Sequence, residues 1–138
     1  MTKEALFGFL DQARLAVVSS ISPEGALQSA LVGIAVSERL EIVFDTLSST
    51  RKYRNLLQHA SCAVVIGWDN ETTVQFEGEA RLLEGEERET YQAVYFRKWP
   101  DGMERLRWPG ICHFVIRPVW IRYSDYNQAT YEITEWRF

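Results

Sequence analysis

The chain has 138 residues, of which 46% are hydrophobic and 13% aromatic, so it is long enough to build one well-filled core. Its net charge is −4 and its pI is about 5.2, which argues against a general nucleic-acid binder, because such proteins carry a broad basic face. No apolar run approaches the roughly 18–20 residues of a membrane span, and the N-terminal segment has no signal-peptide core. We therefore expect one cytoplasmic domain, residues 1–138, that binds neither nucleic acid nor membranes.

The chain alternates between short helix-like and strand-like segments. Apolar residues that recur at spacings of three and four predict a helix over residues 3–13. Residues 15–21 and 26–36 predict a hairpin around the turn Ser22–Gly25, and Gly33 indicates a bulge or the close approach of another group. The later segments predict further strands and one long helix, namely strands over 40–46, 62–68, 72–83, 111–123 and 130–138 and a helix over 85–98.

Six or seven strands joined by tight turns indicate an antiparallel sheet, because parallel strands need long crossover connections. So many strands in so short a chain favour a closed or nearly closed barrel, which leaves few strand edges exposed. The predicted fold class is therefore mainly β, an antiparallel β-barrel with two or three flanking helices. Pro118 is expected to bend or divide the strand that contains it.

The segment from Phe44 to Leu56 carries the strongest chemical signal in the chain. It runs from the end of a strand, through a hydroxyl-rich turn, into a helix that Ser49 or Thr50 caps. Arg51, Lys52 and Arg54 all lie near the start of this helix, where a cation normally costs roughly 0.3–1 kcal/mol because of the helix dipole. Such a cluster is typical of a site where hydroxyls, helix N–H groups and cations together hold a phosphate.

The remaining residues with reactive side chains give weaker signals. Cys62 and Cys112 lie in apolar, strand-like runs and are expected to be reduced, buried thiols. His59 follows a helix, where a cation is favourable, and His113 lies within a strand, where a buried histidine is expected. No histidines or cysteines have the spacing of metal ligands, so we expect no metal site, and no residue is identified as a catalytic acid, base or nucleophile.

Two motifs in this order resemble the pyridoxamine 5′-phosphate oxidase-like family of flavin-binding split barrels. The first is an apolar strand ending in Thr46, followed by Thr50-Arg51-Lys52 and, in the same helix, Asn55-Leu56. The second is the strand Thr73–Ala80, in which Gln75 and Gly78 match the family's Gln-x-x-Gly pattern. The similarity in order and spacing extends from about residue 5 to residue 120.

The resemblance implies a six-stranded antiparallel split β-barrel and a homodimer with flavin mononucleotide (FMN) at each end of the dimer interface. It implies that Arg51 and Lys52 contact the FMN phosphate, with hydroxyl or backbone donors from Thr46 and Thr50. It places Gln75 near the ring system or ribityl chain. The residue set is completed by strand residues 28–32, including Ser29, along the isoalloxazine ring, and by Trp120 and Arg122, which are candidates to reach the cofactor from the partner chain.

The sequence also departs from the family pattern. The oxidases that act on pyridoxamine phosphate carry an Arg and, later, a Lys on the second strand, where this chain has Gln28–Ile34 with neither cation. Their C-terminal arginine motif is not recognisable in residues 133–138. Pyridoxamine phosphate is therefore not the expected substrate.

The prediction is an FMN-dependent oxidoreductase that acts on a small-molecule substrate or electron donor. The alternative is a non-catalytic carrier or sensor of flavin or haem on the same barrel. A deazaflavin in place of FMN is a further alternative within the enzyme class, because a phosphate-binding helix does not distinguish these cofactors.

Overall fold

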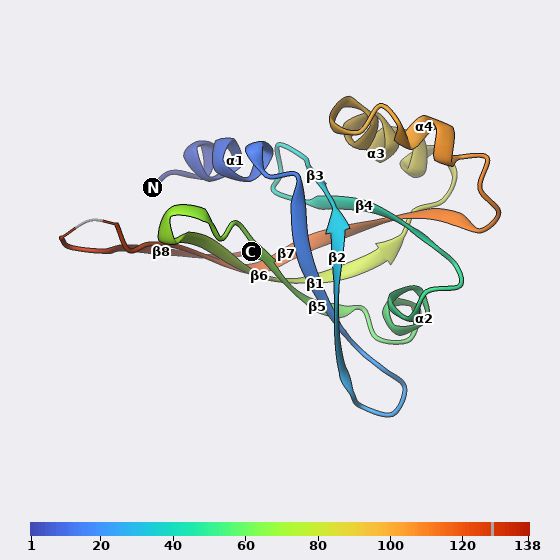
Figure 1. Ribbon diagram of the computed structural model, residues 1–138, viewed down its shortest axis with the longest axis horizontal. Coiled ribbons are helices and arrows are strands. Elements are labelled where there is room, and N and C mark those ends of the chain that lie inside the picture. The colour runs from blue at the N-terminus through green and yellow to red at the C-terminus, as the bar shows by residue number, and fades with distance from the viewer. Residues whose placement is uncertain (128) are drawn as a thin grey trace.

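The computed structural model describes residues 1–127 and 129–138 of the chain (Figure 1). The four α-helices in this part of the chain are α1 (Lys3–Gln12), α2 (Arg51–Gln58), α3 (Gly85–Lys98) and α4 (Gly102–Arg105), with one 3-10 turn, η1 (Asp69–Glu71). The strands are β1 (Leu15–Ile21), β2 (Leu27–Gly33), β3 (Ala35–Val36), β4 (Ile42–Leu47), β5 (Ser61–Ile66), β6 (Thr72–Leu82), β7 (Ile111–Asp125) and β8 (Glu132–Arg137).

All strand pairings among these elements are antiparallel, in the order β2-β1-β5-β6-β7-β4-β3. The sheet forms a six-stranded barrel, and β8 pairs with β7 as an outside strand. The predicted fold class, a mainly β antiparallel barrel with flanking helices, is thereby confirmed. None of the described helices has both the length and the apolar character that crossing a membrane requires.

The hairpin of β1 and β2 is present as predicted, with Leu15 opposite Gly33 and Ile21 opposite Leu27. The expectation of one strand over residues 26–36 is wrong, because the chain leaves β1 after Gly33 and pairs with β4 as the separate strand β3. The close approach expected at Gly33 is made by Trp99: a Cβ atom at this position would lie 2.8 Å from the indole ring. The Trp99 indole N–H also donates to Ile34 O at 2.9 Å.

The long strand β7 bends where the proline predicted it would. Its register against β6 shifts between Glu77 and Gly78, opposite Pro118. A Cβ atom on Gly78 would lie 2.5 Å from Arg117 O, so the two strands approach too closely there for any larger residue. The bend allows β7 to pair with β4 through its first half and with β8 through its second half.

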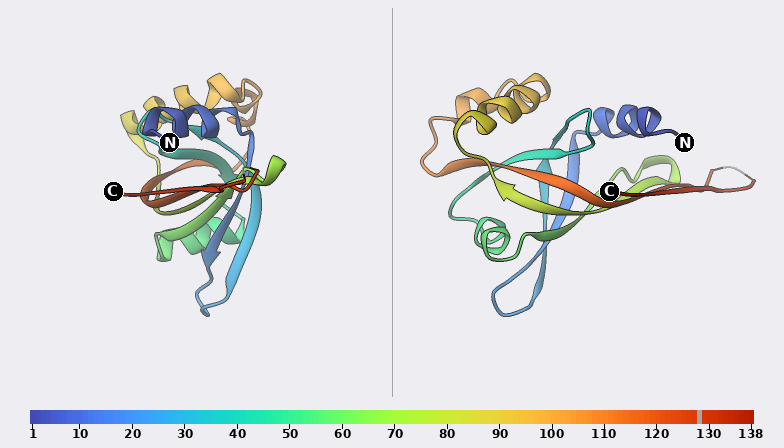
Figure 2. Two further views of the ribbon diagram at one scale, coloured as in Figure 1. Left: turned by 90° about the vertical axis from the view of Figure 1, so that its left-hand side faces the viewer. Right: turned by 180° about the vertical axis from the view of Figure 1, so that it is seen from behind.

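Two clusters of buried side chains hold the domain together. The larger one fills the barrel and includes Phe44, Phe76 and Phe114, with Leu6 and Leu10 of α1 closing one end. The smaller one lies between α3 and the other face of β4 and β7, where Tyr91 and Tyr95 pack against strand residues. Figure 2 shows α1, α3 and α4 together on one side of the sheet and α2 on the opposite side. This arrangement leaves the start of α2 beside the free edge of β2.

Candidate anion-binding site at the start of α2

The turn between β4 and α2 is organised by two threonine hydroxyls. Thr50 is the N-cap of α2, and its Oγ1 accepts a hydrogen bond from Tyr53 N at 3.4 Å. The same hydroxyl donates to Leu47 O at 3.0 Å and lies 3.0 Å from Thr46 Oγ1. Because Thr50 has one hydroxyl proton and gives it to Leu47, the hydrogen bond between the threonines is donated by Thr46. Both hydroxyl protons are therefore used to shape the turn.

The backbone of this turn keeps several donors free. Among the described residues, no acceptor lies in hydrogen-bond range of the N–H groups of Ser49, Arg51 and Lys52. They are the unpaired donors that every helix N-terminus carries, and they lie where the helix dipole favours a negative charge. The turn therefore presents a set of N–H groups that fits an anion.

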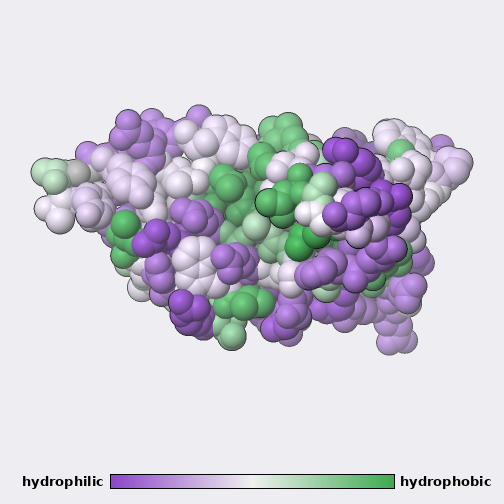
Figure 3. Space-filling model, turned by 90° about the horizontal axis from the view of Figure 1, so that it is seen from below, coloured by the Kyte–Doolittle hydropathy of each residue, from purple (hydrophilic) through white to green (hydrophobic). Residues whose placement is uncertain are grey.

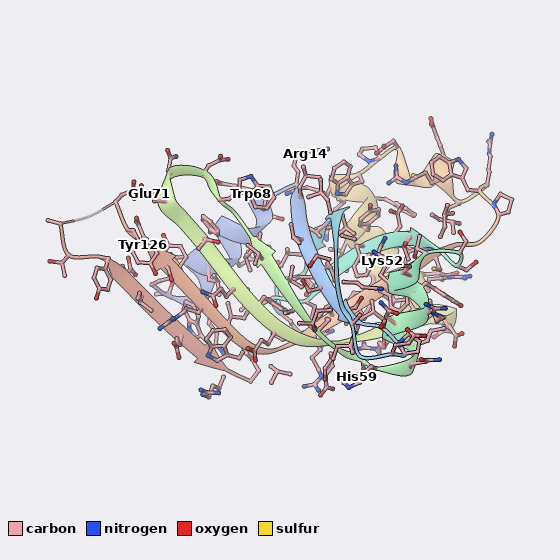
Figure 4. The ribbon with its side chains drawn as sticks, turned by 60° about the horizontal axis from the view of Figure 1, so that its bottom comes forward. Arg14, Lys52, His59, Trp68, Glu71 and Tyr126 are labelled. Atoms are coloured by element: carbon pink, nitrogen blue, oxygen red, sulfur yellow. The ribbon has the colours of Figure 1, made fainter. Side chains whose placement is uncertain are left out.

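Two cations flank these N–H groups, and neither forms an ion pair with an acid in the part of the chain that the structure describes. The Arg51 side chain is exposed, whereas Lys52 is half-buried. Burial lowers the pKa of Lys52, and nearby Asp45 and Cys112 partly oppose that shift. An anion bound beside Lys52 would offset this desolvation. Figure 4 shows Lys52 at the start of α2, next to β1 and β2, with His59 at the opposite end of the helix.

A cavity of about 350 Å³ lies between the start of α2 and the β1–β2 hairpin. Its lining joins the predicted residues Ser29, Thr50, Arg51 and Lys52 to residues that the motifs did not identify. These additional residues are Val18, Ser20, Gln28, Ala30 and Ser49. The cavity is thus formed by segments that are about 20 to 30 positions apart in the sequence.

The two walls of the cavity are joined by Asn55 of α2, which is fully buried. Its side-chain amide donates to Ser20 Oγ at 3.0 Å and to Gln28 Oε1 at 2.9 Å. The Asn-Leu pair of the sequence motif therefore has a structural explanation: Leu56 enters the barrel core, and Asn55 fixes the hairpin to the helix. Sequence alone identified Asn55 but not its partners, because they lie 35 and 27 positions away.

The turn is also held from the side of β7. Ser48 N donates to Gly110 O at 2.8 Å, and the Cys112 thiol donates to Thr46 O at 3.2 Å. Gly110 has a φ of 81°, and a Cβ atom there would lie 2.6 Å from Ser48 Oγ. These contacts fix the distance between the turn and the chain that leads into β7, and no local pattern in the sequence reveals them.

The strand β2 continues the site away from α2. Among the described strands it pairs only with β1, so its other edge presents unpaired backbone groups. At its far end Trp99 covers Gly33, and the Arg14 guanidinium lies 4.2 Å from the centre of the Trp99 ring. In Figures 1 and 4, α2 and the α3–α4 pair both lie beside the free edge of β2, one toward each end of the strand. Arg14 lies at the end that is remote from Lys52.

Three residues of the predicted set lie elsewhere in the chain. Gln75 and Arg122 are directly opposite each other on β6 and β7, and Gln75 is exposed on the outer face of the barrel. Arg122 forms an ion pair with Glu135 at 2.9 Å, and the Trp120 indole N–H donates to the same carboxylate at 3.4 Å. The strands β5 and β1 separate Gln75 from β2 in the sheet. Within a single chain, these residues therefore do not line the cavity at α2. Thr46 of the predicted set is buried behind the turn, where its hydroxyl lies 3.0 Å from that of Thr50.

The described part of the chain supplies the site with neither a cluster of metal ligands nor a reactive thiol. No group of three or more His, Cys, Asp or Glu residues with metal-binding geometry occurs within residues 1–127 and 129–138. Burial raises the pKa of the Cys112 thiol to about 11, with a further contribution from Asp45, and raises that of Cys62 to about 12. Both thiols are therefore protonated near neutral pH.

The protein is a mainly β barrel in which the N-terminus of a helix, with unpaired N–H groups among the described residues, lies beside the edge of a strand. These features define its class as a split-barrel domain. Residues 2–124 match the family model described as pyridoxamine 5′-phosphate oxidase, so the chain belongs to that family. The family resemblance seen in the sequence motifs is thereby confirmed. A comparison with curated proteins found no match.

Solved structures with the same fold have different ligands. A haem-binding protein from Mycobacterium smegmatis has a TM-score of 0.81 and 16% identity, over 96% of this chain and 57% of its own. The protein Atu2129 of unknown function from Agrobacterium tumefaciens has a TM-score of 0.77 and 17% identity, over 88% and 55%. A pyridoxamine 5′-phosphate oxidase-related, FMN-binding protein from Nostoc punctiforme has a TM-score of 0.69 and 12% identity, over 99% and 92%. The chain thus spans little more than half the length of the first two, and at these identities the likeness establishes the fold.

Proposed function

We propose that this protein binds FMN at the start of α2 and acts as an FMN-dependent oxidoreductase. The observation that supports this most directly is a set of N–H groups, those of Ser49, Arg51 and Lys52, that have no acceptor among the described residues. Two cations with no acidic partner in that part of the chain flank them. A phosphate monoester offers three acceptor oxygens and nearly two negative charges at neutral pH, which suits this set. Family membership and the FMN-binding relative support the choice of FMN among phosphate-bearing ligands.

The lining of the cavity fits a flavin phosphate better than a haem. Haem iron is held by His, Cys, Met or Tyr side chains. None of these residue types lines the cavity at α2 among the described residues, and neither His59 nor His113 faces it. The described lining is instead rich in hydroxyls, amides and cations. Haem is therefore the alternative cofactor, and the absorption spectrum described below distinguishes it from FMN.

In this proposal the chain's own residues bind and orient the cofactor. Arg51 and the N–H groups of the turn hold the phosphate, and the fork of the guanidinium binds two of its oxygens. Gln28 and Ser29 lie beside the adjoining part of the cavity, and the backbone edge of β2 supports the remainder along the strand. FMN, when bound, supplies hydride transfer through its ring. Trp99 packs over Gly33 at the far end of β2.

The proposal includes a homodimer formed through the outer face of β1, β2 and β5. Leu27, Leu31 and Val65 are 82%, 61% and 42% exposed, although each lies within a strand. Figure 3, which views the molecule from below, shows apolar side chains gathered across the middle of this face, with polar side chains around them. Such a patch is typical of a protein interface. Gln75 and Trp120 lie on the outer faces of the neighbouring strands, so a second copy is the route by which they reach the site.

The first experiment identifies the cofactor. The purified protein is examined by absorption spectroscopy, and the released cofactor is identified by its mass. FMN is expected; a deazaflavin, or a haem spectrum with no flavin uptake, contradicts the proposal. Reduction of the bound FMN by NADH or NADPH then separates an enzyme from a carrier, because a flavin that no donor reduces indicates storage or sensing.

The second experiment tests the residues that hold the phosphate. Arg51→Ala is expected to weaken FMN binding roughly 10- to 100-fold, the effect of removing a charged hydrogen bond. It should leave riboflavin binding unchanged, because riboflavin lacks the phosphate. Arg54→Ala is the matched control: Arg54 is an exposed cation of the same helix that does not line the cavity. Equal losses for FMN and riboflavin, or for the two variants, would overturn the assignment.

The third experiment tests the dimer. Val65→Glu places a charge in the middle of the apolar face and is expected to produce monomers in sedimentation velocity. Leu57→Glu is the control, because Leu57 is 51% exposed on α2 and lies outside that face. A Val65→Glu variant with an unchanged sedimentation coefficient would exclude this interface.

A further inference from the structure

The buried side chain of Asn55 lies behind the cavity at α2 and contacts both of the strands that form the far wall of that cavity. Its amide nitrogen lies 3.0 Å from Ser20 Oγ of β1 and 2.9 Å from Gln28 Oε1 of β2. Its amide oxygen has no partner among the residues that the structure describes. Because Ser20 and Gln28 both line the cavity, the orientation of this one amide decides which of their atoms remain for a ligand.

The direction of these hydrogen bonds follows from the donors and acceptors of an amide. The Asn55 nitrogen carries two protons, and in this orientation it gives one to Ser20 and one to Gln28. Only an oxygen is then left unpaired. In proteins, buried carbonyl oxygens that lack a partner are less rare than buried N–H groups that lack one. The orientation in which Asn55 donates twice is therefore the favourable one.

This contact fixes the polarity of the Gln28 side chain. Since Gln28 Oε1 accepts from Asn55, the Gln28 amide nitrogen Nε2 keeps both of its protons for another partner. Nε2 has no acceptor among the described residues, and it is not one of their buried atoms without a partner, so it has accessible surface. The end of Gln28 that a ligand in the cavity can reach is therefore the donor end.

The two walls of the cavity thus offer donors of different kinds. The α2 wall offers the N–H groups of the turn and the charged side chains of Arg51 and Lys52. The β2 wall offers the uncharged donor of Gln28. Ser20 also accepts from Asn55 and keeps its own proton, but it is only 2% exposed, so the contact with a ligand falls to Gln28. A group that brings acceptors only, such as an ionised phosphate, matches both walls.

We propose that Gln28 determines specificity at this site by donating to a phosphate oxygen from the side opposite Arg51 and Lys52, and that Asn55 is the residue that positions it. This inference rests on the proposed FMN function and adds a second wall to the phosphate site. Asn55 does not touch the ligand, because it is completely buried. It acts through Gln28, whose amide would present its oxygen to the phosphate, and repel it, if Asn55 were turned the other way.

The first test uses inorganic phosphate and the full-length chain freed of cofactor. In proton–nitrogen NMR the side-chain NH2 groups of Asn55 and Gln28 give separate signals. The Asn55 protons are expected to exchange slowly with water even without phosphate, because both are buried and hydrogen-bonded. The Gln28 signal is expected to shift in a saturable manner as phosphate is added. Slow exchange at Gln28 together with no response to phosphate would show the opposite polarity and overturn the proposal.

A matched pair of variants tests the contact with the ligand. Gln28→Met keeps the length of the side chain and removes the donor, so it is expected to weaken FMN binding roughly tenfold and to leave riboflavin binding unchanged. Gln58→Met is the control, because Gln58 is exposed on α2 and does not line the cavity. If Arg51→Ala weakens FMN binding and Gln28→Met does not, this inference fails and the FMN proposal stands. If phosphate shifts the Gln28 signal but the protein takes up no FMN, the cofactor is wrong and the role of Gln28 stands.

The positioning role of Asn55 needs its own test. Asn55→Leu removes the amide at similar size, so Gln28 loses its fixed orientation, and the preference for FMN over riboflavin is expected to fall. Adding Gln28→Met to this variant should lower that preference little further, because Asn55 acts through Gln28. A further tenfold loss in the double variant would contradict the positioning role. Should Asn55→Leu fail to fold, the exchange rates of the two NH2 groups in the unchanged protein still decide the polarity.

Discussion

Two clusters of charged residues lie close together in this domain, and they differ in how their positive charge is neutralised. At the start of α2, Arg51 and Lys52 have no acidic partner in the described chain. Beneath α3, Arg105 donates to Asp45 at 2.7 Å and to Asp101 at 2.8 Å, and also lies 3.3 Å from the Tyr95 hydroxyl. The second cluster is neutralised by its own carboxylates, whereas no acid in the described chain pairs with the cations of the first. We infer that the first cluster serves a ligand and the second serves the fold.

Asp45 connects the two clusters. It lies next to Thr46 in β4, and it acts on the pKa of Lys52 through its charge. Both of its carboxylate oxygens are already engaged, one by Arg105 and the other by the Tyr95 hydroxyl at 3.1 Å. Burial raises the pKa of Tyr95, and the negative charge of Asp45 adds to that shift. Asp45 therefore acts on Lys52 through its charge and forms no ion pair with it in the described structure.

The largest effect is expected from breaking the complete cluster. Arg105 and Asp45 have side chains that are only 18% and 15% exposed, so Arg105→Met leaves a poorly hydrated carboxylate without its partner. We expect the free energy of unfolding to fall by about 3 kcal/mol, measured by urea denaturation. FMN binding should also weaken, because the released Asp45 would compete with the phosphate for Lys52. Arg107→Met is the control, since Arg107 is exposed and forms no ion pair with a described residue; an equal loss there would contradict this account.

The next effect concerns the contact that holds the turn at α2. Gly110→Ala forces a side chain into a left-handed backbone conformation and against Ser48, and we expect it to cost about 1–2 kcal/mol of stability and to weaken FMN binding. Gly25→Ala is a matched control, because Gly25 has a similar φ of 85° but has nothing within 4 Å of the added Cβ. Both variants should lose stability in thermal unfolding, but only Gly110→Ala should lose FMN affinity. Unchanged FMN binding in Gly110→Ala would show that the Ser48 contact does not position the site.

A smaller effect is expected from pH. Lys52 is charged below its pKa, so its attraction for the phosphate is complete at lower pH and is lost as the pH rises through that value. Because burial lowers this pKa, the loss begins at a lower pH than for an ordinary lysine. Above about pH 8, where the phosphate is fully ionised, FMN affinity should fall with increasing pH and riboflavin affinity should not. Lys52→Arg should abolish the difference, and a fall that persists in this variant would rule out Lys52 as its source.

The smallest effect is a gain in stability. Without ligand, Arg51 lies unfavourably at the positive end of the α2 dipole. Arg51→Ala should therefore stabilise the FMN-free protein by about 0.3–1 kcal/mol in urea denaturation, while it weakens the FMN complex. Arg97 lies in the last turn of α3, where the helix dipole favours a cation. Arg97→Ala should therefore leave the free energy of unfolding unchanged or lower it by roughly a few tenths of a kcal/mol, which is opposite to the change expected for Arg51→Ala. A destabilised Arg51→Ala would mean that Arg51 supports the fold.

Much of the fold followed from local patterns. The helix over 85–98 matches α3 at both ends, and the alternation of apolar residues in β6 places Val74 and Phe76 in the core and Gln75 outside it. The expected strand over 26–36 was wrong because the change of pairing after Gly33 depends on Trp99, which lies 65 positions away from Ile34. A local pattern reports the conformation of a segment, and it does not report which distant segment will cover it.

The sequence by itself determined the antiparallel barrel class and the turn at Thr50-Arg51-Lys52, because strand alternation, the helix cap and the helix dipole are properties of neighbouring residues. Only the tertiary structure decided that Arg105 pairs with Asp45, that Ser48 donates to Gly110, and that Asn55 joins α2 to the β1–β2 hairpin. The first two contacts depend on the register of β4 against β7 and on the packing of α3 over both strands, and the third depends on the packing of α2 against the hairpin. Contacts between residues about 60 positions apart are set by the sum of all the pairings in the sheet.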